Sequence, residues 1–156
     1  MKLHPEPLVI AANVTQAAFC RLDTVLLTFG FLVMQYQQML DEEDCAASMS
    51  IISSLEKRWA AADQDIFIAT VIINPFFRAD PFGRNPRFVV AGIIELLGRL
   101  YTRFFLEEPP HAFNVELREY LTTAGQYSEL HATCIRHKIQ AQQQVCLCSG
   151  LNLLEA

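Results

Sequence analysis

The segment from Asn85 to Phe105 constrains the fold most, because it carries apolar residues around most of a predicted helix. Asn85 before Pro86 is typical of a helix start, with a capping side chain ahead of a proline at the first helical position. The two apolar stripes are Val89, Ile93, Leu96, Leu100, Phe104 and Val90, Ile94, Leu97, Tyr101, Phe105, and the polar strip is Glu95, Arg99, Arg103. A helix that is apolar on most sides has to lie in a core, so other helices are expected to cover it.

Other segments have the periodicity of amphipathic helices. Apolar residues recur at intervals of three and four from Leu22 to Leu40, and Asp23 or Thr24 is a candidate cap for that helix. The next predicted helix has Ile52, Leu55 and Trp59 on its buried side and Glu56, Lys57 and Arg58 outside. Further helices are expected at about 113–121 and from Ser128 onward. The sequence predicts an all-α protein, a single irregular bundle of about five to six helices.

The segment Ile66 to Ile73 has two interpretations. Its β-branched residues favour a buried strand. Asp63-Gln64-Asp65 before it and Pro75 after it are instead typical of helix boundaries. A Pro- and Gly-containing loop is expected between this segment and the apolar helix.

Length and composition favour a globular protein. With 156 residues, 52% of them apolar, the chain has enough apolar material for one core. We assign residues 1–137 to one helical domain and residues 138–156 to a divergent tail with weak periodicity, predicted to be poorly ordered. The net charge of −5 argues against a protein that coats nucleic acid over its whole surface.

Basic residues concentrate in one part of this acidic chain. Residues 76–105 hold five arginines and two acidic residues. Arginine side chains and helix N-termini bind phosphate oxygens, so these arginines are candidates for contact with a DNA backbone, with a solvated surface as the alternative. Arg99 and Arg103 can also pair with Glu95 and Glu107 along the helix. The candidates are Arg78, Arg84, Arg87, Arg99 and Arg103.

Five cysteines at irregular spacing fit reduced thiols in an intracellular protein better than a disulfide framework. The N-terminus does not have the pattern of a signal peptide. The longest apolar window, Leu22 to Met34, is too short to span a bilayer, so no membrane segment is predicted. No glycine-rich phosphate loop and no cofactor motif is present.

Four blocks of the chain, in this order, resemble the helical region of hAT-family transposases of the kind common in fungal genomes. They are LVIAANVTQAAFCRLDTVLLTFG (8–30), SLEKRWAAADQDIFIATVIINPFFR (54–78), NPRFVVAGIIELLGRLYTRFF (85–105) and ELREYLTTAGQYSEL (116–130). The turn from Asn74 to Arg78 is similar to the Asp/Asn-Pro-aromatic-basic signature of that family. The resemblance favours a helix over Ile66 to Ile73, and we predict one.

The resemblance implies a helical insertion that has lost its catalytic neighbour. In the family this region interrupts a ribonuclease-H-like fold, between the second catalytic aspartate and the final glutamate. Strand transfer needs those carboxylates to hold divalent cations. The chain is therefore expected to lack the ribonuclease-H-like sheet and to be a non-catalytic remnant, nuclear by resemblance, with no catalytic residue and no cofactor. Weak, non-specific DNA binding and self-association through exposed apolar surface are the expected activities; the alternative is a co-opted helical module for protein-protein interaction.

Several residues have a second interpretation. His131, Cys134 and His137 are spaced three apart on a predicted helix, so neighbouring pairs could share a metal, although no fourth ligand is evident. Acids at 41–44, and at Asp63 and Asp65, are expected to complement helix N-termini rather than bind metal. Trp59 is expected in the core, with stacking on an unpaired base as the alternative. No metal site is predicted.

Overall fold

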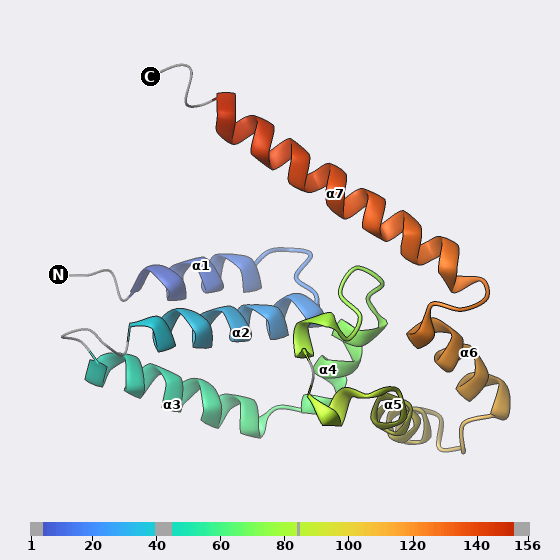
Figure 1. Ribbon diagram of the computed structural model, residues 1–156. Coiled ribbons are helices and arrows are strands. Elements are labelled where there is room, and N and C mark those ends of the chain that lie inside the picture. Colours follow the sequence, from blue (N-terminus) through green and yellow to red (C-terminus); the bar gives the residue numbers. More distant parts are fainter. Residues whose placement is uncertain (1–4, 40–44, 84, 152–156) are drawn as a thin grey trace. The chain divides into compact units, whose positions relative to one another are not determined.

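The computed structural model describes residues 5–39, 45–83 and 85–151, with side chains as far as residue 142. These residues form seven α-helices, two short 3-10 helices and no strand (Figure 1). The predicted all-α class is confirmed. The chain divides into two compact units, Met1–Val71 and Ile72–Ala156, and each is described by itself.

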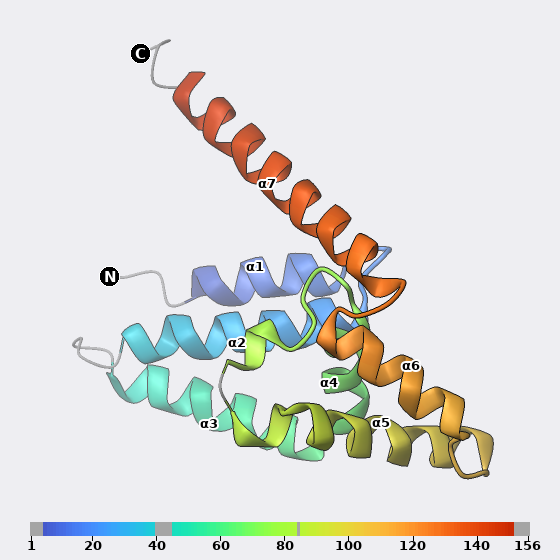
Figure 2. The same ribbon diagram turned by 45° about the vertical axis from the view of Figure 1, so that its right-hand side comes forward.

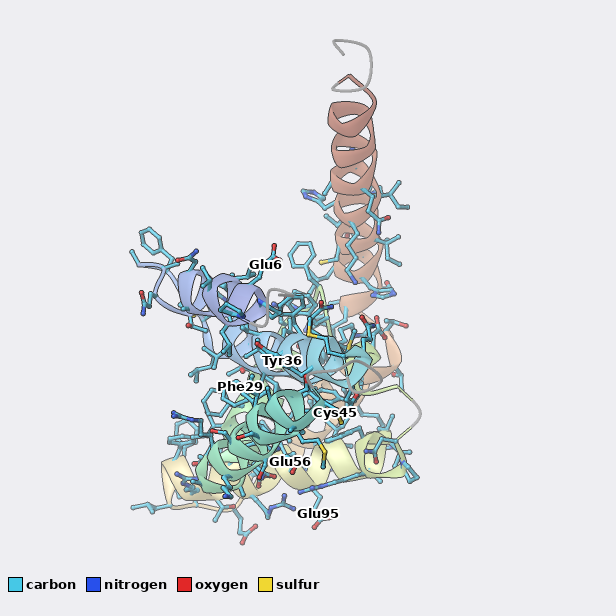
Figure 3. The ribbon with its side chains drawn as sticks, turned by 90° about the vertical axis from the view of Figure 1, so that its left-hand side faces the viewer. Glu6, Phe29, Tyr36, Cys45, Glu56 and Glu95 are labelled. Carbon is cyan, nitrogen blue, oxygen red and sulfur yellow. The ribbon has the colours of Figure 1, made fainter. Side chains whose placement is uncertain are left out.

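The first unit contains α1 (Pro5–Thr15), α2 (Leu22–Gln38), α3 (Cys45–Ala61) and most of α4 (Gln64–Ile73). Helix α2 lies between α1 and α3 and packs against both (Figures 1 and 2). Helix α1 is an element that the spacing of apolar residues did not predict. The core of the unit combines residues from these three helices. It consists of Ala11, Leu32, Tyr36 and Leu55, with Phe29, Phe31, Val33, Met39, Ile51 and Ile52 packed against it (Figure 3).

The start of α2 is held by a buried carboxylate. The Asp23 side chain accepts a hydrogen bond from the backbone N–H of Thr24 at 2.9 Å and pairs with the Arg21 guanidinium at 2.7 Å. The residue at the cap position is Arg21, whose side chain makes no capping bond. Asp23 therefore acts from inside the first turn, where a carboxylate also complements the positive end of the helix dipole.

Trp59 belongs to an aromatic cluster of the first unit. Its ring centroid lies 6.5 Å from that of Phe29 and 6.1 Å from that of Phe67. The neighbouring charged residues Glu56, Lys57 and Arg58 are exposed, as predicted. The contacts of Trp59 with rings on α2 and α4 favour its role as a half-buried packing residue.

The segment Ile66–Ile73 is helical, which confirms that prediction. Helix α4 begins at Gln64, and the Asp63 carbonyl oxygen accepts hydrogen bonds from the N–H groups of Ile66 and Phe67 at 3.2 and 3.5 Å. The helix ends one residue before Asn74-Pro75. Local boundary signals thus outweigh the strand propensity of the β-branched residues between them.

The second unit contains η1 (Asp80–Phe82), η2 (Pro86–Phe88), α5 (Val90–Phe105), α6 (His111–Thr122) and α7 (Tyr127–Leu151). The α5 helix begins four residues later than Pro86, so the predicted start is wrong. Asn85 does accept the backbone N–H of Arg87 at 2.9 Å, but it caps a 3-10 turn. Val89 is then extended, with ψ of 161°, and breaks the helical path before α5. Helix α7 includes the first part of the predicted tail.

Helix α5 buries one side and exposes its end. Its buried residues are Ile93, Leu96, Leu97 and Leu100. The last apolar residues of the predicted stripes lie on the surface instead: Phe104 is 63% exposed and Phe105 62%. Leu106, which follows the helix with φ of 58°, is 87% exposed.

Candidate functional site at the Arg78 turn

The turn that ends α4 is built around Asn74. The buried Asn74 side-chain oxygen accepts the N–H of Phe76 at 2.9 Å, and its carbonyl oxygen accepts those of Phe77 and Arg78 at 3.0 and 2.8 Å. These bonds reverse the chain and leave Arg78 with φ of 55°. A left-handed conformation is unfavourable for a residue with a Cβ atom, by about 1–2 kcal/mol. The interactions of the Arg78 side chain offset that cost.

Arg78 contacts both Tyr120 and His131 in this site. One guanidinium nitrogen donates to the backbone carbonyl oxygen of Tyr120, and Nη1 lies 3.2 Å from Nδ1 of His131. The guanidinium also lies 5.0 Å from the centroid of the Tyr120 ring, in cation–π geometry. The half-buried Arg78 side chain thus joins the α4 turn to α6 and α7. Two of its guanidinium nitrogens thus face groups of the protein itself.

Tyr120 completes the site from α6. Its hydroxyl lies 2.9 Å from the carbonyl oxygen of Ile72 and 3.0 Å from that of Ile73, and donates its one proton to this pair. Carbonyls in the last turn of a helix have no partner within the helix, so this hydroxyl satisfies groups that α4 leaves open. Burial raises the pKa of Tyr120, and the positive charge of Arg78 lowers it to a lesser extent. The phenol is therefore favoured over the phenolate.

The cavity at this site is small. It is lined by Pro75, Arg78, Tyr120, Tyr127, Leu130 and His131, and its volume is about 10 Å³. That is close to the lower limit for one water molecule. The rings of Tyr120 and Tyr127 meet edge to face across 5.4 Å. The site is packed side chain on side chain and has no room for an organic substrate.

A second hollow of about 580 Å³ lies along α5. Arg99 and Arg103 both line it, one helical turn apart. Arg99 pairs with Glu95 at 3.1 Å, and Arg103 lies over the Phe104 ring at 5.7 Å from its centroid. The α5 groove, as we call this hollow, is lined by Ile94, Glu95, Gly98, Arg99, Thr102, Arg103, Glu108, Pro109 and Asn114. It therefore carries two arginines and two glutamates.

Four of the five arginine candidates lie in the described part of the chain. Arg99 and Arg103 share the α5 groove, whereas Arg78 lies at the α4 turn. Arg87 is exposed on η2, and Arg84 lies outside the described residues. The predicted pairing of Arg99 with Glu95 is confirmed.

The residues considered as metal ligands, His131, Cys134 and His137, all lie on α7. Within the described ranges, no group of three or more His, Cys, Asp or Glu side chains is arranged to hold a metal ion. His131 contacts Arg78, Cys134 is buried, and His137 is exposed. The acids at 41–44 lie outside the described residues. Of the helices described, none combines the length and hydropathy that crossing a bilayer requires.

Sequence reasoning missed Tyr120, and it assigned other roles to Arg78 and His131. Arg78 precedes Tyr120 by 42 residues and His131 by 53. No local spacing pattern reports on such contacts. Comparison with known proteins adds no assignment: no protein family, no curated protein and no solved structure matches this chain.

Proposed function

We propose that this chain is a non-catalytic helical module that acts by associating with a second copy of itself through the end of α5. The observation that carries the proposal is the exposure of three consecutive large apolar residues, Phe104, Phe105 and Leu106, at 63%, 62% and 87%. Contiguous exposed apolar surface usually marks an interaction site in a protein. Each side chain of this kind stabilises an assembly by about 1.5–3 kcal/mol when it becomes completely buried.

The adjacent α5 groove favours a second copy as the partner. Its charges are of both signs, from Arg99, Arg103, Glu95 and Glu108. In a two-fold symmetric dimer the same surface occurs on both copies, so a patch with both signs can complement itself. A DNA backbone would meet the two glutamates as well as the two arginines, which weakens phosphate binding here.

The four blocks that resemble hAT transposases support an origin of the module from such an enzyme. In the ancestral transposase, the surface of the helical insertion would have lain beside the catalytic core. The runner-up is a module that uses the same apolar surface to bind a different protein. Reading the genomic DNA on both sides would test the origin, because upstream strands with aspartates and a downstream glutamate helix would identify the rest of a transposase gene.

The test of association is light scattering coupled to size exclusion. We expect a dimer for the natural chain and a monomer for Phe104→Ser combined with Leu106→Ser. The matched control is Phe19→Ser combined with Met49→Ser, which removes two exposed apolar side chains, 94% and 60% exposed, outside the second unit. A monomeric natural chain, or a control that dissociates as the test variant does, would overturn the proposal.

DNA binding is measured on the same proteins by fluorescence anisotropy with a short duplex at low salt. We expect no binding that depends on Arg99 and Arg103. Salt-sensitive binding lost in Arg99→Gln combined with Arg103→Gln would instead favour a DNA-backbone function.

A further inference from the structure

The α5 groove has a largely apolar floor and a charged rim. Along α5, Ile94, Gly98 and Thr102 follow one another at intervals of four residues, so they lie on one face of the helix. They form the floor together with Pro109 and Asn114, and all five residues are half-buried. The four charged residues that line the groove are exposed. An apolar centre inside a polar rim is the arrangement found in protein–protein interfaces.

Gly98 keeps the floor of the groove open. A Cβ atom at this position would lie 3.9 Å from Cγ of Pro109, which is an ordinary van der Waals contact. Gly98 lies inside α5, where glycine is less stable than alanine by about 0.5–1 kcal/mol. Neither the available space nor the helix therefore requires glycine here. The missing side chain does leave depth between α5 and Pro109, which a side chain of another molecule can fill.

The exposed apolar end of α5 adjoins this groove. Arg103 and Glu108, which line the groove, flank the segment 104–106 in the sequence. The Phe105 ring packs against the Tyr101 ring, with 4.6 Å between the two centroids, so it is already held in place in the single chain. A neighbouring molecule that covers the apolar end can therefore cover the groove as well.

The apolar end alone is too small for a stable dimer. Stable complexes bury about 800 Å² of surface on each partner. An aromatic side chain contributes about 150–250 Å² when it is completely buried. Phe104, Phe105 and Leu106 are in part covered already, so these three side chains fall short of that area. A dimer needs further surface, and the α5 groove continues the apolar end.

On the basis of the association proposed above, we propose that the α5 groove of each copy receives Phe104 and Leu106 of the other copy. Two-fold symmetry forms this contact twice, since each copy brings both an apolar end and a groove. The groove volume of about 580 Å³ lies within the range of pockets that bury whole organic ligands, so two side chains fit. The two arginines and two glutamates of the rim balance, so identical rims do not repel each other through net charge.

The test is to fill the groove. Gly98→Gln combined with Thr102→Gln places two polar side chains on the floor, favours the helix and adds no apolar surface. We expect this groove variant to be a monomer in light scattering coupled to size exclusion. The matched control, Ala91→Gln combined with Ala132→Gln, changes exposed helical positions outside the groove lining and should stay a dimer. A groove variant that dimerises as the control does would overturn the insertion and leave association through the end of α5 standing.

A mixture of two variants distinguishes insertion from a contact between two apolar ends. The end variant, Phe104→Ser combined with Leu106→Ser, keeps its groove, and the groove variant keeps its apolar end. One insertion remains possible between them, so the mixture should form a heterodimer whose average molar mass rises with concentration above that of either variant alone. A mixture that stays monomeric up to the highest soluble concentration would overturn the insertion. A monomeric natural chain would overturn the association together with it.

Should the groove variant not fold, the natural chain decides. In a mixture of isotope-labelled and unlabelled copies, isotope-filtered NMR detects only contacts between copies. We expect a contact between the Ile94 methyl groups of one copy and Phe104 or Leu106 of the other. Within one copy, about 15 Å of helix separate Ile94 from Phe104, so this signal cannot arise inside a single chain. Its absence from a dimeric sample would overturn the insertion.

Discussion

The hydroxyl of Tyr120 on α6 lies 2.9 Å from the carbonyl oxygen of Ile72 in the last turn of α4. The two residues are 48 apart in sequence, and this bond gives the end of α4 a partner that its own helix cannot provide. Together with Arg78 above the Tyr120 ring, it makes α6 the support of the α4 turn.

Tyr120→Phe is expected to lower the free energy of unfolding by about 1–3 kcal/mol, because two carbonyl oxygens at the end of α4 lose their donor. Urea denaturation followed by circular dichroism measures the change. Tyr101→Phe is the matched control, since the described contacts of Tyr101 are ring contacts with Phe105 and Phe113. Equal losses in both variants would show that the hydroxyl of Tyr120 has no special role.

Stability is expected to fall at alkaline pH. Burial raises the folded-state pKa of Tyr120 above 10.0, so the folded chain keeps the phenolic proton that the unfolded chain releases. The contribution is present below about pH 10 and is lost as the pH rises through the folded-state value. Tyr120→Phe should reduce this loss, and Tyr36, whose pKa burial also raises, accounts for part of what remains. An unchanged pH profile in the variant would contradict the assignment to Tyr120.

Arg78→Ala and Arg78→Gly remove the same side-chain contacts but differ in backbone strain. We expect Arg78→Ala to destabilise the chain by about 2–3 kcal/mol, since a charged donor and its partners are lost. Arg78→Gly should be less destabilising by about 1 kcal/mol, because glycine adopts positive φ at little cost. Chemical denaturation of both variants checks the order. A less stable glycine variant would mean that the turn does not keep φ of 55° in solution.

Two glycines inside helices are expected to respond in opposite directions to alanine. A Cβ atom at Gly92 would lie 2.4 Å from the carbonyl oxygen of Arg87, so Gly92→Ala has to displace η2 and should cost about 1–3 kcal/mol. A Cβ atom at Gly30 meets nothing within 4 Å, and Gly30→Ala should stabilise α2 by about 0.5–1 kcal/mol. Thermal unfolding distinguishes the two, and a neutral Gly92→Ala would show that η2 does not pack on α5 as described.

If the chain is the non-catalytic module proposed above, the purified protein is expected neither to cut nor to join DNA with magnesium or manganese, because strand transfer needs a set of carboxylates that holds the divalent cations. A supercoiled plasmid assay measures nicking. Reproducible divalent-dependent nicking that disappears in Asp63→Ala or Asp65→Ala would contradict this prediction and would assign chemistry to the start of α4.

Local signals predicted local structure well. The boundaries of α4 follow from acids before Ile66 and a proline after Ile73, and the pairing of Arg99 with Glu95 follows from helical spacing. The start of α5 was misplaced because the same Asn-Pro signal also suits a 3-10 turn. Apolar periodicity predicted burial for Phe104, whereas its exposure depends on how far the neighbouring helices extend.

The candidate site could not be predicted in this way. Arg78 was one of five candidates for contact with a DNA backbone, with a solvated surface as the alternative, because it is basic and lies in a loop with arginines nearby. Its actual partners come from α6 and α7, and tertiary packing alone brings them within 3.2 Å of its guanidinium, as at His131. The sequence therefore singled out Arg78 but did not predict its partners on α6 and α7.

Leu106 combines a left-handed backbone with an almost fully exposed side chain. In a solitary copy this residue has an unfavourable conformation and receives no packing in return, and glycine would end the helix with less strain. In the assembly proposed above the balance would be reversed, because the side chain would enter an apolar contact that glycine could not make. Under that proposal, the residue that best ends the helix of a solitary copy differs from the residue that best serves the assembled protein. The cost of Leu106 to the stability of the single chain would then be offset by association.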